Sequence, residues 1–256
     1  MTSPERTLLI AGWKSVSLVD VYGHPSFTLW LCGCNLSCPF CHNWRIANAE
    51  GSVCRYVDVQ NILEEVHASR ALIDYFHVTG GEPLLQHDKL AALFLELGNA
   101  EIPRSLNSNL TLIGEFKYLA ERGLVDHVVT DLKAPPEELY GLPPTASRKL
   151  WQSFLSSLLI VGELSIPLEL RIPVHRKLSP EILSYYISQI TDKLRAEKTT
   201  VVVNPLLGEP LVSPRSSEWS REYCGVNSEH LSKIVEALKS HGFSRIFVKA
   251  IPGFQQ

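Results

Sequence analysis

Three cysteines lie close together in the stretch CNLSCPFCHN, which runs from residue 34 to residue 43. Thiolates spaced as Cys34, Cys38 and Cys41 can converge on one metal centre. The chain has six cysteines, and four of them fall between residues 32 and 41. In an intracellular chain such a group is more typical of metal binding than of a disulfide framework, so no disulfide is expected.

The number of available ligands separates two kinds of metal group. A structural zinc ion takes four ligands, usually from two well-separated pairs, and no second C-x-x-C pair is present. Cys32, His42 or Cys54 could complete a zinc site. A [4Fe–4S] cluster held by three thiolates would instead leave one iron open to a small molecule, as in a catalytic centre. Cys54 and Cys224 have no partner in the sequence and are otherwise interpreted as structural thiols.

Other candidate functional residues come directly after short apolar runs. One group is the GGEP stretch, in which two glycines would let a ligand approach the backbone, although a tight turn without a ligand is the alternative. For Asn107, Ser108 and Asn109 the alternative is a polar strand end exposed to water. For Asp131 and Lys133 the alternative is a surface ion pair. The candidates are Gly80, Gly81, Glu82, Pro83, Asn107, Ser108, Asn109, Asp131 and Lys133, together with Arg171, a lone arginine inside the apolar run LELRIPV.

Alternating apolar runs and amphipathic segments predict the elements that position these residues. The expected strands are 26–31, 74–79, 104–108, 126–132, 167–174, 200–205 and 245–250. The expected helices are 58–70, 87–98, 112–122, 146–161, 179–196 and 228–241. Helix C-caps are expected at Gly98, Gly123 and Gly242, and an N-cap at Ser179 before Pro180.

This alternation predicts right-handed βαβ units in an α/β fold. Six units are fewer than the eight of a closed barrel, so the expected architecture is an incomplete (β/α)6 TIM-like barrel with parallel strands and outer helices. Ligands of such folds bind at the carboxyl ends of strands, where the candidate residues lie. A single domain over 1–256 is expected, with a long loop over 205–227 near the barrel mouth.

Composition limits the classes of function. The chain has 256 residues, of which 45% are hydrophobic and 20% charged, and this is enough for a sizeable core. The net charge of −3 gives no general attraction for nucleic acid, although this count does not detect a local basic patch. No segment is typical of a membrane span or a signal peptide, so a cytoplasmic location is expected.

The motifs resemble those of the radical S-adenosylmethionine superfamily. The C-x-x-x-C-x-x-C spacing, with Phe40 before the last cysteine, is similar to the superfamily signature. The stretch SLVDVYGHPSFTLWLCGCNLSCPFCHN resembles the activating enzymes of glycyl radical enzymes, of the pyruvate formate-lyase and anaerobic ribonucleotide reductase activase type. The GGEP and DLK stretches, Arg171 and the final HLSKIVEALKSHGFSRIFVK follow in the order of that family.

The resemblance implies a mechanism and its residues. Cys34, Cys38 and Cys41 would hold a single [4Fe–4S] cluster, whose open iron would be chelated by S-adenosylmethionine. Reductive cleavage of S-adenosylmethionine would give a 5′-deoxyadenosyl radical that abstracts hydrogen, most simply from a glycine of a partner glycyl radical enzyme. Lys133 and Arg171 are placed in the catalytic set. The cofactor-binding set implied by the family is Phe40, His42, Asn43, Gly80, Gly81, Glu82, Pro83, Asn107, Ser108, Asn109, Asp131, Lys133 and Arg171.

The resemblance also implies partners and leaves an alternative substrate open. A reductant protein, flavodoxin or ferredoxin, would supply the electron. Asn107 and Leu110 stand where the family commonly has aspartate and glycine. In some relatives that aspartate helps to bind a monovalent cation together with the later aspartate. The loss of one carboxylate therefore weakens the expectation of a cation near Asn107 and Asp131. The stretch around Leu207 lacks the histidine often found there, and Arg215, Trp219 and Arg221 could hold a phosphate or a planar group. Radical modification of RNA, lipid or a small metabolite is therefore the alternative function.

Overall fold

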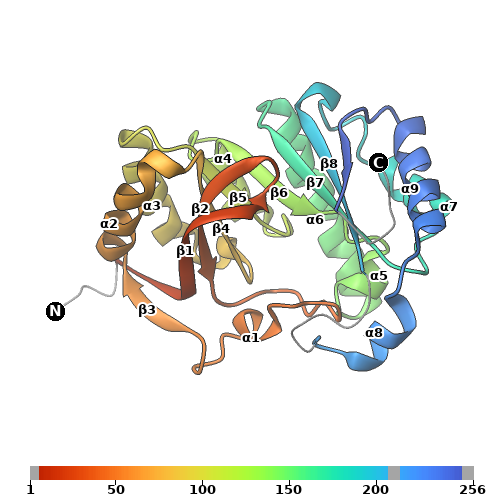
Figure 1. Cartoon of the computed structure of the whole chain (residues 1–256), viewed down its shortest axis with the longest axis horizontal. Coiled ribbons are helices and arrows are strands. Elements are labelled where there is room, and N and C mark those ends of the chain that lie inside the picture. Colours follow the sequence, from red (N-terminus) through yellow and green to blue (C-terminus); the bar gives the residue numbers. More distant parts are fainter. Residues whose placement is uncertain (1–5, 207–213, 250–256) are drawn as a thin grey trace. The chain divides into compact units, whose positions relative to one another are not determined.

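The computed structural model describes residues 6–206 and 214–249 of the chain (Figure 1). The chain divides into two compact units, which are described one at a time. The first contains residues 1–35 and 43–129, and the second contains residues 36–42 and 130–256. The expectation of one domain over 1–256 stays a prediction, and Leu207 lies outside the described residues.

The sheet of the first unit has the strand order β3-β1-β2-β4-β5-β6. The four strands β2 (His24–Leu31), β4 (Tyr75–Gly80), β5 (Arg104–Asn107) and β6 (His127–Asp131) pair in parallel, as predicted. Their carboxyl ends therefore lie at one edge of the sheet, where Leu31 is in register with Gly80. The last two residues of β6 belong to the second unit.

Two antiparallel strands of the first unit were not expected. β1 (Thr7–Val21) pairs with β2 and with β3 (Arg55–Asp58), and both pairings are antiparallel. The register of β1 against β2 shifts three times between Ile10 and Val21. These bulges break the simple alternation of buried and exposed residues, which is why period-two reasoning misses the strand. The expectation that all strands run in parallel is therefore wrong for this edge of the sheet.

The helices of the first unit follow from their apolar faces. The α-helices are α1 (Trp44–Ala47), α2 (Val59–Ser69), α3 (His87–Asn99) and α4 (Ile113–Ala120), and the 3-10 helices are η2 (Arg70–Leu72) and η3 (Pro83–Gln86). α3 buries Leu90, Leu93, Phe94 and Leu97, the residues whose spacing predicts it. Gly123 has a φ of +64° just after α4, in the conformation expected of a cap. Gly98 lies inside α3 instead, so its predicted capping role is wrong.

The second unit carries the other parallel strands, in the order β7-β8-β9. These are β7 (Leu168–Val174), β8 (Thr199–Pro205) and β9 (Ile246–Val248). The α-helices are α5 (Pro136–Leu139), α6 (Pro144–Glu163), α7 (Pro180–Ile187), α8 (Ser217–Tyr223) and α9 (Ser228–Ser240), with a 3-10 helix η4 (Ala196–Lys198). Ser179 caps α7 by accepting a hydrogen bond from the backbone N–H of Ile182, as predicted. α7 is shorter than expected, and α8 lies within the region predicted as a loop.

The fold prediction is confirmed at the level of class. The chain is an α/β protein with a mainly parallel sheet, and helices connect its parallel strands. No helix in residues 6–206 and 214–249 is long and apolar enough to cross a membrane.

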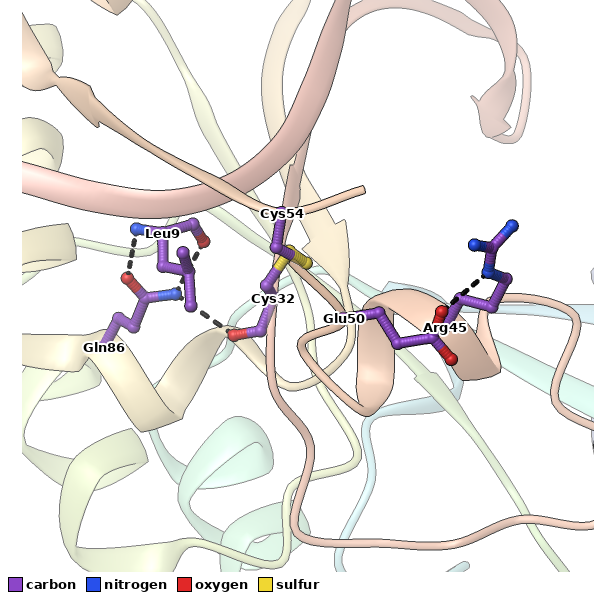
Figure 2. Close-up of a disulfide and its surroundings, with 6 residues drawn as sticks. All are labelled: Leu9, Cys32, Arg45, Glu50, Cys54 and Gln86. Atoms are coloured by element: carbon purple, nitrogen blue, oxygen red, sulfur yellow. Dashed lines mark hydrogen bonds and ion pairs between the residues drawn. A yellow bond between two sulfur atoms is a disulfide. The ribbon is translucent and has the colours of Figure 1, made fainter. Parts of the chain in front are cut away.

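One covalent feature contradicts the sequence analysis. Cys32, one residue after β2, forms a disulfide with Cys54, one residue before β3 (Figure 2). The expectation of no disulfide, and the interpretation of Cys54 as an unpartnered structural thiol, are therefore wrong. The reason is topological, because β1 lies between β2 and β3 and pairs with both. This pairing brings the Cα atoms of the two cysteines within 6.3 Å, a separation that a disulfide can bridge.

Candidate functional site

The segment Leu36–His42, which carries two of the three candidate metal ligands, belongs to the second unit. The backbone N–H of Ser37 donates to the Tyr140 carbonyl at 2.9 Å, and the N–H of Ser216 donates to the Pro39 carbonyl at 3.1 Å. The N–H of Cys41 closes a turn onto the carbonyl of Cys38 at 3.2 Å. The segment is therefore fixed by backbone bonds on both sides of Cys38.

Two neighbours of this segment could not be identified from the sequence. A Cβ on Gly141 would lie 2.0 Å from the Ser37 carbonyl oxygen, and Gly141 has a φ of +67°, so the position requires glycine. Tyr140 is buried, and burial together with the nearby Cys38 raises the pKa of its phenol. The Phe40 ring packs on Trp219 of α8 with the ring centroids 5.7 Å apart. α8 thus packs against the segment.

Cys34 lies in the first unit and is held by a different set of side chains. The side-chain amide of Asn109 donates to Asn35 Oδ1 at 2.8 Å and lies 3.9 Å from Cys34 Sγ. The amide of Asn35 donates to Thr111 Oγ1 at 2.8 Å, and Thr111 Oγ1 donates to Asn109 Oδ1 at 2.6 Å. This closed ring of bonds fixes the backbone around Cys34. It gives Asn109 a place beside a candidate ligand, whereas Thr111 was not singled out in the sequence.

The two glycines of the GGEP stretch meet protein backbone. A Cβ on Gly80 would lie 2.2 Å from the Leu31 carbonyl oxygen, and one on Gly81 would lie 2.0 Å from that of Gly33. The N–H of Glu82 donates to the same Gly33 carbonyl at 2.7 Å. The stretch therefore packs directly against the residues that precede Cys34, and this contact is sufficient reason for both glycines.

Glu82 is buried and accepts hydrogen bonds from three groups of the first unit. Its Oε1 accepts from the N–H of Leu84 at 3.0 Å and from Ser108 Oγ at 2.8 Å. Its Oε2 accepts from the N–H of Asn109 at 2.7 Å. A buried carboxylate that is bonded in this way orders the loop that carries Asn109. The place of Glu82 in the cofactor-binding set stays a prediction.

The remaining uncharged candidates are Pro83, Asn107 and Asn43 of the first unit and His42 of the second. Pro83 is the first residue of η3, which suits its fixed φ. Asn107 donates its amide N–H to Thr79 Oγ1 at 2.9 Å. Asn43 precedes α1 and is exposed. His42, across the boundary in the second unit, is also exposed. Cation binding at Asn107 and Asp131 stays untested.

Four charged side chains form two ion pairs at β6 and β7 of the second unit. Lys133 Nζ lies 2.9 Å from Asp131 Oδ2, and Arg171 Nε lies 2.7 Å from Glu169 Oε1. Burial raises the pKa of Asp131, but the charges of Lys133, Arg171 and Lys249 outweigh it, so the pKa is lowered overall. Lys133 is thus paired with Asp131, and a role of either side chain in binding S-adenosylmethionine stays a prediction.

The thiols that remain fit a [4Fe–4S] cluster with one open iron. Because Cys32 and Cys54 are joined, the chain keeps four thiols, at Cys34, Cys38, Cys41 and Cys224. Cys224 is buried and accepts a hydrogen bond from Ser220 Oγ at 3.5 Å. Within the described ranges, no three Cys, His, Asp or Glu side chains gather to hold a single metal ion. The three candidate thiols lie on one short stretch of sequence, and three is the number of protein thiolates that leaves one iron of a [4Fe–4S] cluster open. Their assignment as its ligands stays a prediction.

Comparison with known proteins identifies the class. Residues 29–186 match the Radical SAM superfamily, and the match includes all three candidate ligands. The chain belongs to the radical SAM superfamily, whose members use a [4Fe–4S] cluster and S-adenosylmethionine. It is therefore a radical SAM enzyme.

The chain is also similar in sequence to three curated proteins. The chain is 28% identical over 125 residues to a Methanocaldococcus jannaschii protein named "Putative glycyl-radical enzyme activating enzyme", a match that covers 49% of this chain and 50% of that protein. A Haemophilus influenzae protein of the same name is 32% identical over 115 residues, with 45% and 41% covered. The 7-carboxy-7-deazaguanine synthase of Methanospirillum hungatei is 37% identical over 93 residues, with 35% and 36% covered. The chain spans half or less of the length of these relatives.

A solved structure supports the fold. TYW1 with a lysine-pyruvate adduct bound is similar to this chain with a TM-score of 0.50 at 12% sequence identity, over 84% of this chain and 73% of that one. At this identity the likeness concerns the fold alone.

Proposed function

We propose that the protein activates a glycyl radical enzyme by removing a hydrogen atom from a glycine of that partner. When bound, the [4Fe–4S] cluster supplies the electron that cleaves S-adenosylmethionine, and the resulting 5′-deoxyadenosyl radical abstracts the hydrogen. A flavodoxin or a ferredoxin is the proposed source of the electron. The curated relatives named as activating enzymes support the assignment, and one feature of the second unit carries it.

That feature is a set of buried polar atoms that face no hydrogen-bond partner among the described residues. They are Nδ1 of His175, Nε1 of Trp219 and Oδ1 of Asn204. His175 directly follows β7, Asn204 lies near the end of β8, and the rings of His175 and Trp219 are 6.1 Å apart between centroids. Buried polar groups normally have partners, so these three atoms are the contacts that we propose for a bound substrate.

The chemistry of these atoms suits a polypeptide. His175 Nε2 lies 3.4 Å from the Ala134 carbonyl, and if Nε2 donates to it, Nδ1 is an acceptor. Burial lowers the pKa of His175 to about 4, which keeps the ring neutral at physiological pH. Two acceptors, on His175 and Asn204, and one donor, on Trp219, complement the N–H and C=O groups of a peptide backbone. Trp219 also packs on Phe40, so a bound polypeptide would lie next to the segment with Cys38 and Cys41.

The test uses deuterium to follow the hydrogen. Host cells are grown with α-deuterated glycine, and their anaerobic extract is mixed with reduced, cluster-loaded enzyme and S-adenosylmethionine. We expect deuterium in the 5′-deoxyadenosine formed, together with the paramagnetic resonance signal of a protein glycyl radical. With unlabelled extract that signal should be a doublet, because the remaining α-hydrogen splits it.

Two variants separate substrate binding from cofactor chemistry. Trp219→Phe keeps an aromatic ring against Phe40 but removes the N–H, so it should reduce the yield of protein radical and leave slow, substrate-independent 5′-deoxyadenosine formation unchanged. Cys34→Ala should abolish both. Deuterium-free 5′-deoxyadenosine that is stimulated by RNA, lipid or small-molecule fractions, without a protein radical, would contradict the proposal and favour the alternative substrates.

A further inference from the structure

The Cys32–Cys54 disulfide encloses all three candidate cluster ligands. The two cysteines are 22 positions apart, and Cys34, Cys38 and Cys41 lie between them. Figure 2 shows the disulfide joining the chain after β2 to the chain that leads into β3. The covalent bond therefore closes the segment in which the cluster is assembled.

Both ends of this enclosed segment are fixed within the first unit. The Gln86 side chain donates to the Cys32 carbonyl at 3.2 Å and also bonds both the N–H and the carbonyl of Leu9, as Figure 2 shows. At the other end, the N–H of Cys54 donates to the Glu50 carbonyl at 2.9 Å, and Arg45 forms an ion pair with the Glu50 side chain at 2.8 Å. The two thiols would therefore face each other repeatedly even when reduced.

As a thiol, Cys32 would be a competing ligand. It is two residues from Cys34, so its Cα lies within roughly 7 Å of the Cα of that ligand. A [4Fe–4S] cluster is commonly held by four cysteine thiolates, and a fourth thiolate would occupy the iron that S-adenosylmethionine needs. With Cys32 and Cys54 reduced, the chain would carry five thiols between residues 32 and 54, of which a cluster with one open iron can take only three.

We propose that the Cys32–Cys54 disulfide excludes these two thiols from the cluster. Pairing them leaves Cys34, Cys38 and Cys41 as the thiolates of the segment and keeps the fourth iron open. The role belongs to residues outside the superfamily signature, and it explains why the pair flanks the ligand segment. The inference depends on the cofactors of the superfamily and not on the proposed glycyl substrate.

The disulfide forms by exchange with another disulfide. One thiolate of the pair attacks a disulfide on a small thiol compound or on an oxidoreductase, and one thiol is released. The second thiolate then attacks the cysteine sulfur of the resulting mixed disulfide. The Cys32–Cys54 bond forms, and a second thiol is released. The pair loses two electrons and two protons, and the added disulfide is reduced to two thiols.

The test compares four proteins that are purified and loaded with cluster without oxygen or added thiols. They are the unchanged protein, Cys54→Ser, the double variant Cys32→Ser with Cys54→Ser, and Cys224→Ser as a control at a cysteine outside residues 32–54. Differential alkylation and peptide mapping report the disulfide, and iron and sulfide content report the cluster. The main measurement is the change in the paramagnetic resonance spectrum of the reduced cluster when S-adenosylmethionine is added.

Cys54→Ser leaves the Cys32 thiol unpaired, so we expect a normal iron content but a response to S-adenosylmethionine at least several-fold smaller. The double variant has neither thiol and should respond like the unchanged protein and Cys224→Ser. Reduction of the unchanged protein with a phosphine should lower its response, and reoxidation with oxidised glutathione should restore it, which tests the inference even if a variant fails to fold.

Three results would overturn the inference. One is an unchanged protein that is fully loaded and responsive while both cysteines are alkylated as thiols. Another is a normal response of Cys54→Ser. The third is an equal loss of response in the single and double variants at full iron content. The disulfide would then act by holding the segment in place and not by excluding thiols from the cluster. None of these measurements uses the proposed partner protein, so failure here is distinguishable from failure of the proposed function.

Discussion

Replacement of Glu82 by glutamine should weaken the loop beside Cys34 by a calculable amount. The side chain is fully buried, and its two oxygens accept three hydrogen bonds, from Leu84, Ser108 and Asn109. In either orientation, the NH₂ of glutamine would point at one or two N–H or O–H donors, so at least one bond to a charged acceptor is lost. Such a bond contributes roughly 1.5–3 kcal/mol. The unfolding midpoint of a chain of this size should then fall by about 3 to 12 °C.

The assay is anaerobic calorimetry together with urea unfolding, and Glu64→Gln is the matched control. Glu64 lies on the exposed side of α2, so the same change of charge and size there should alter the unfolding free energy by less than about 0.5 kcal/mol. Glu82→Gln should also speed hydrogen exchange at the N–H of Asn109. A Glu82→Gln protein as stable as the control, with a loss confined to S-adenosylmethionine affinity, would refute this reasoning and assign the carboxylate to the cofactor.

Three further predictions concern the second unit. Lys133→Ala removes the cation beside Asp131 and should cost roughly 1.5–3 kcal/mol of unfolding free energy in urea, with weaker binding of S-adenosylmethionine in equilibrium dialysis. Gly141→Ala places a Cβ against the Ser37 carbonyl at a positive φ, so it should destabilise by more than about 1 kcal/mol and lower the iron content after anaerobic loading. His175, whose pKa falls to about 4, binds a proton more readily in the unfolded chain, so stability should decrease by about 2 kcal/mol from pH 7 to pH 5, and His175→Gln should abolish that part.

Matched substitutions control for the change of residue type. Lys149→Ala is exposed on α6 and should leave stability nearly unchanged. Gly114→Ala has no atom within 4 Å of the added Cβ and should be neutral or slightly stabilising. Equal losses at Gly141 and Gly114 would contradict the steric argument, and a pH dependence that His175→Gln leaves intact would assign it to other groups.

The sequence was sufficient to predict the elements whose apolar pattern is regular. β4, β7 and β8 are buried over most of their length, and α3 buries a single stripe of residues, so period and length identify them. The candidate residues were found for a related reason, because polar residues after a parallel strand lie at the edge where ligands bind. Arg171 lies within β7 and was identified by a different signal, as a charge in an otherwise apolar run.

Features that depend on contacts between distant residues could not be predicted. The Cys32–Cys54 disulfide requires β1 to lie between β2 and β3, and the bulges of β1 conceal that strand. The need for glycine at position 141 arises from Ser37, more than a hundred positions earlier, and nothing local to Gly141 indicates it. The partners of Glu82 are similarly remote, so its charge suggested a ligand when three protein donors already surround it.

The bulged strand β1 also bears on self-association. β3 pairs only with residues Thr7–Ile10 of β1, so within the described ranges the outer edge of β1 from residue 11 to residue 21 has no neighbouring strand. An open edge is a template onto which another chain can add a strand, and the side chains of Leu18 and Val19 there are 73% and 69% exposed. Three register shifts and the exposed Lys14 work against a flat, continuous pairing. We therefore expect the same irregularity that hides this strand from sequence reasoning to oppose edge-to-edge aggregation of concentrated protein.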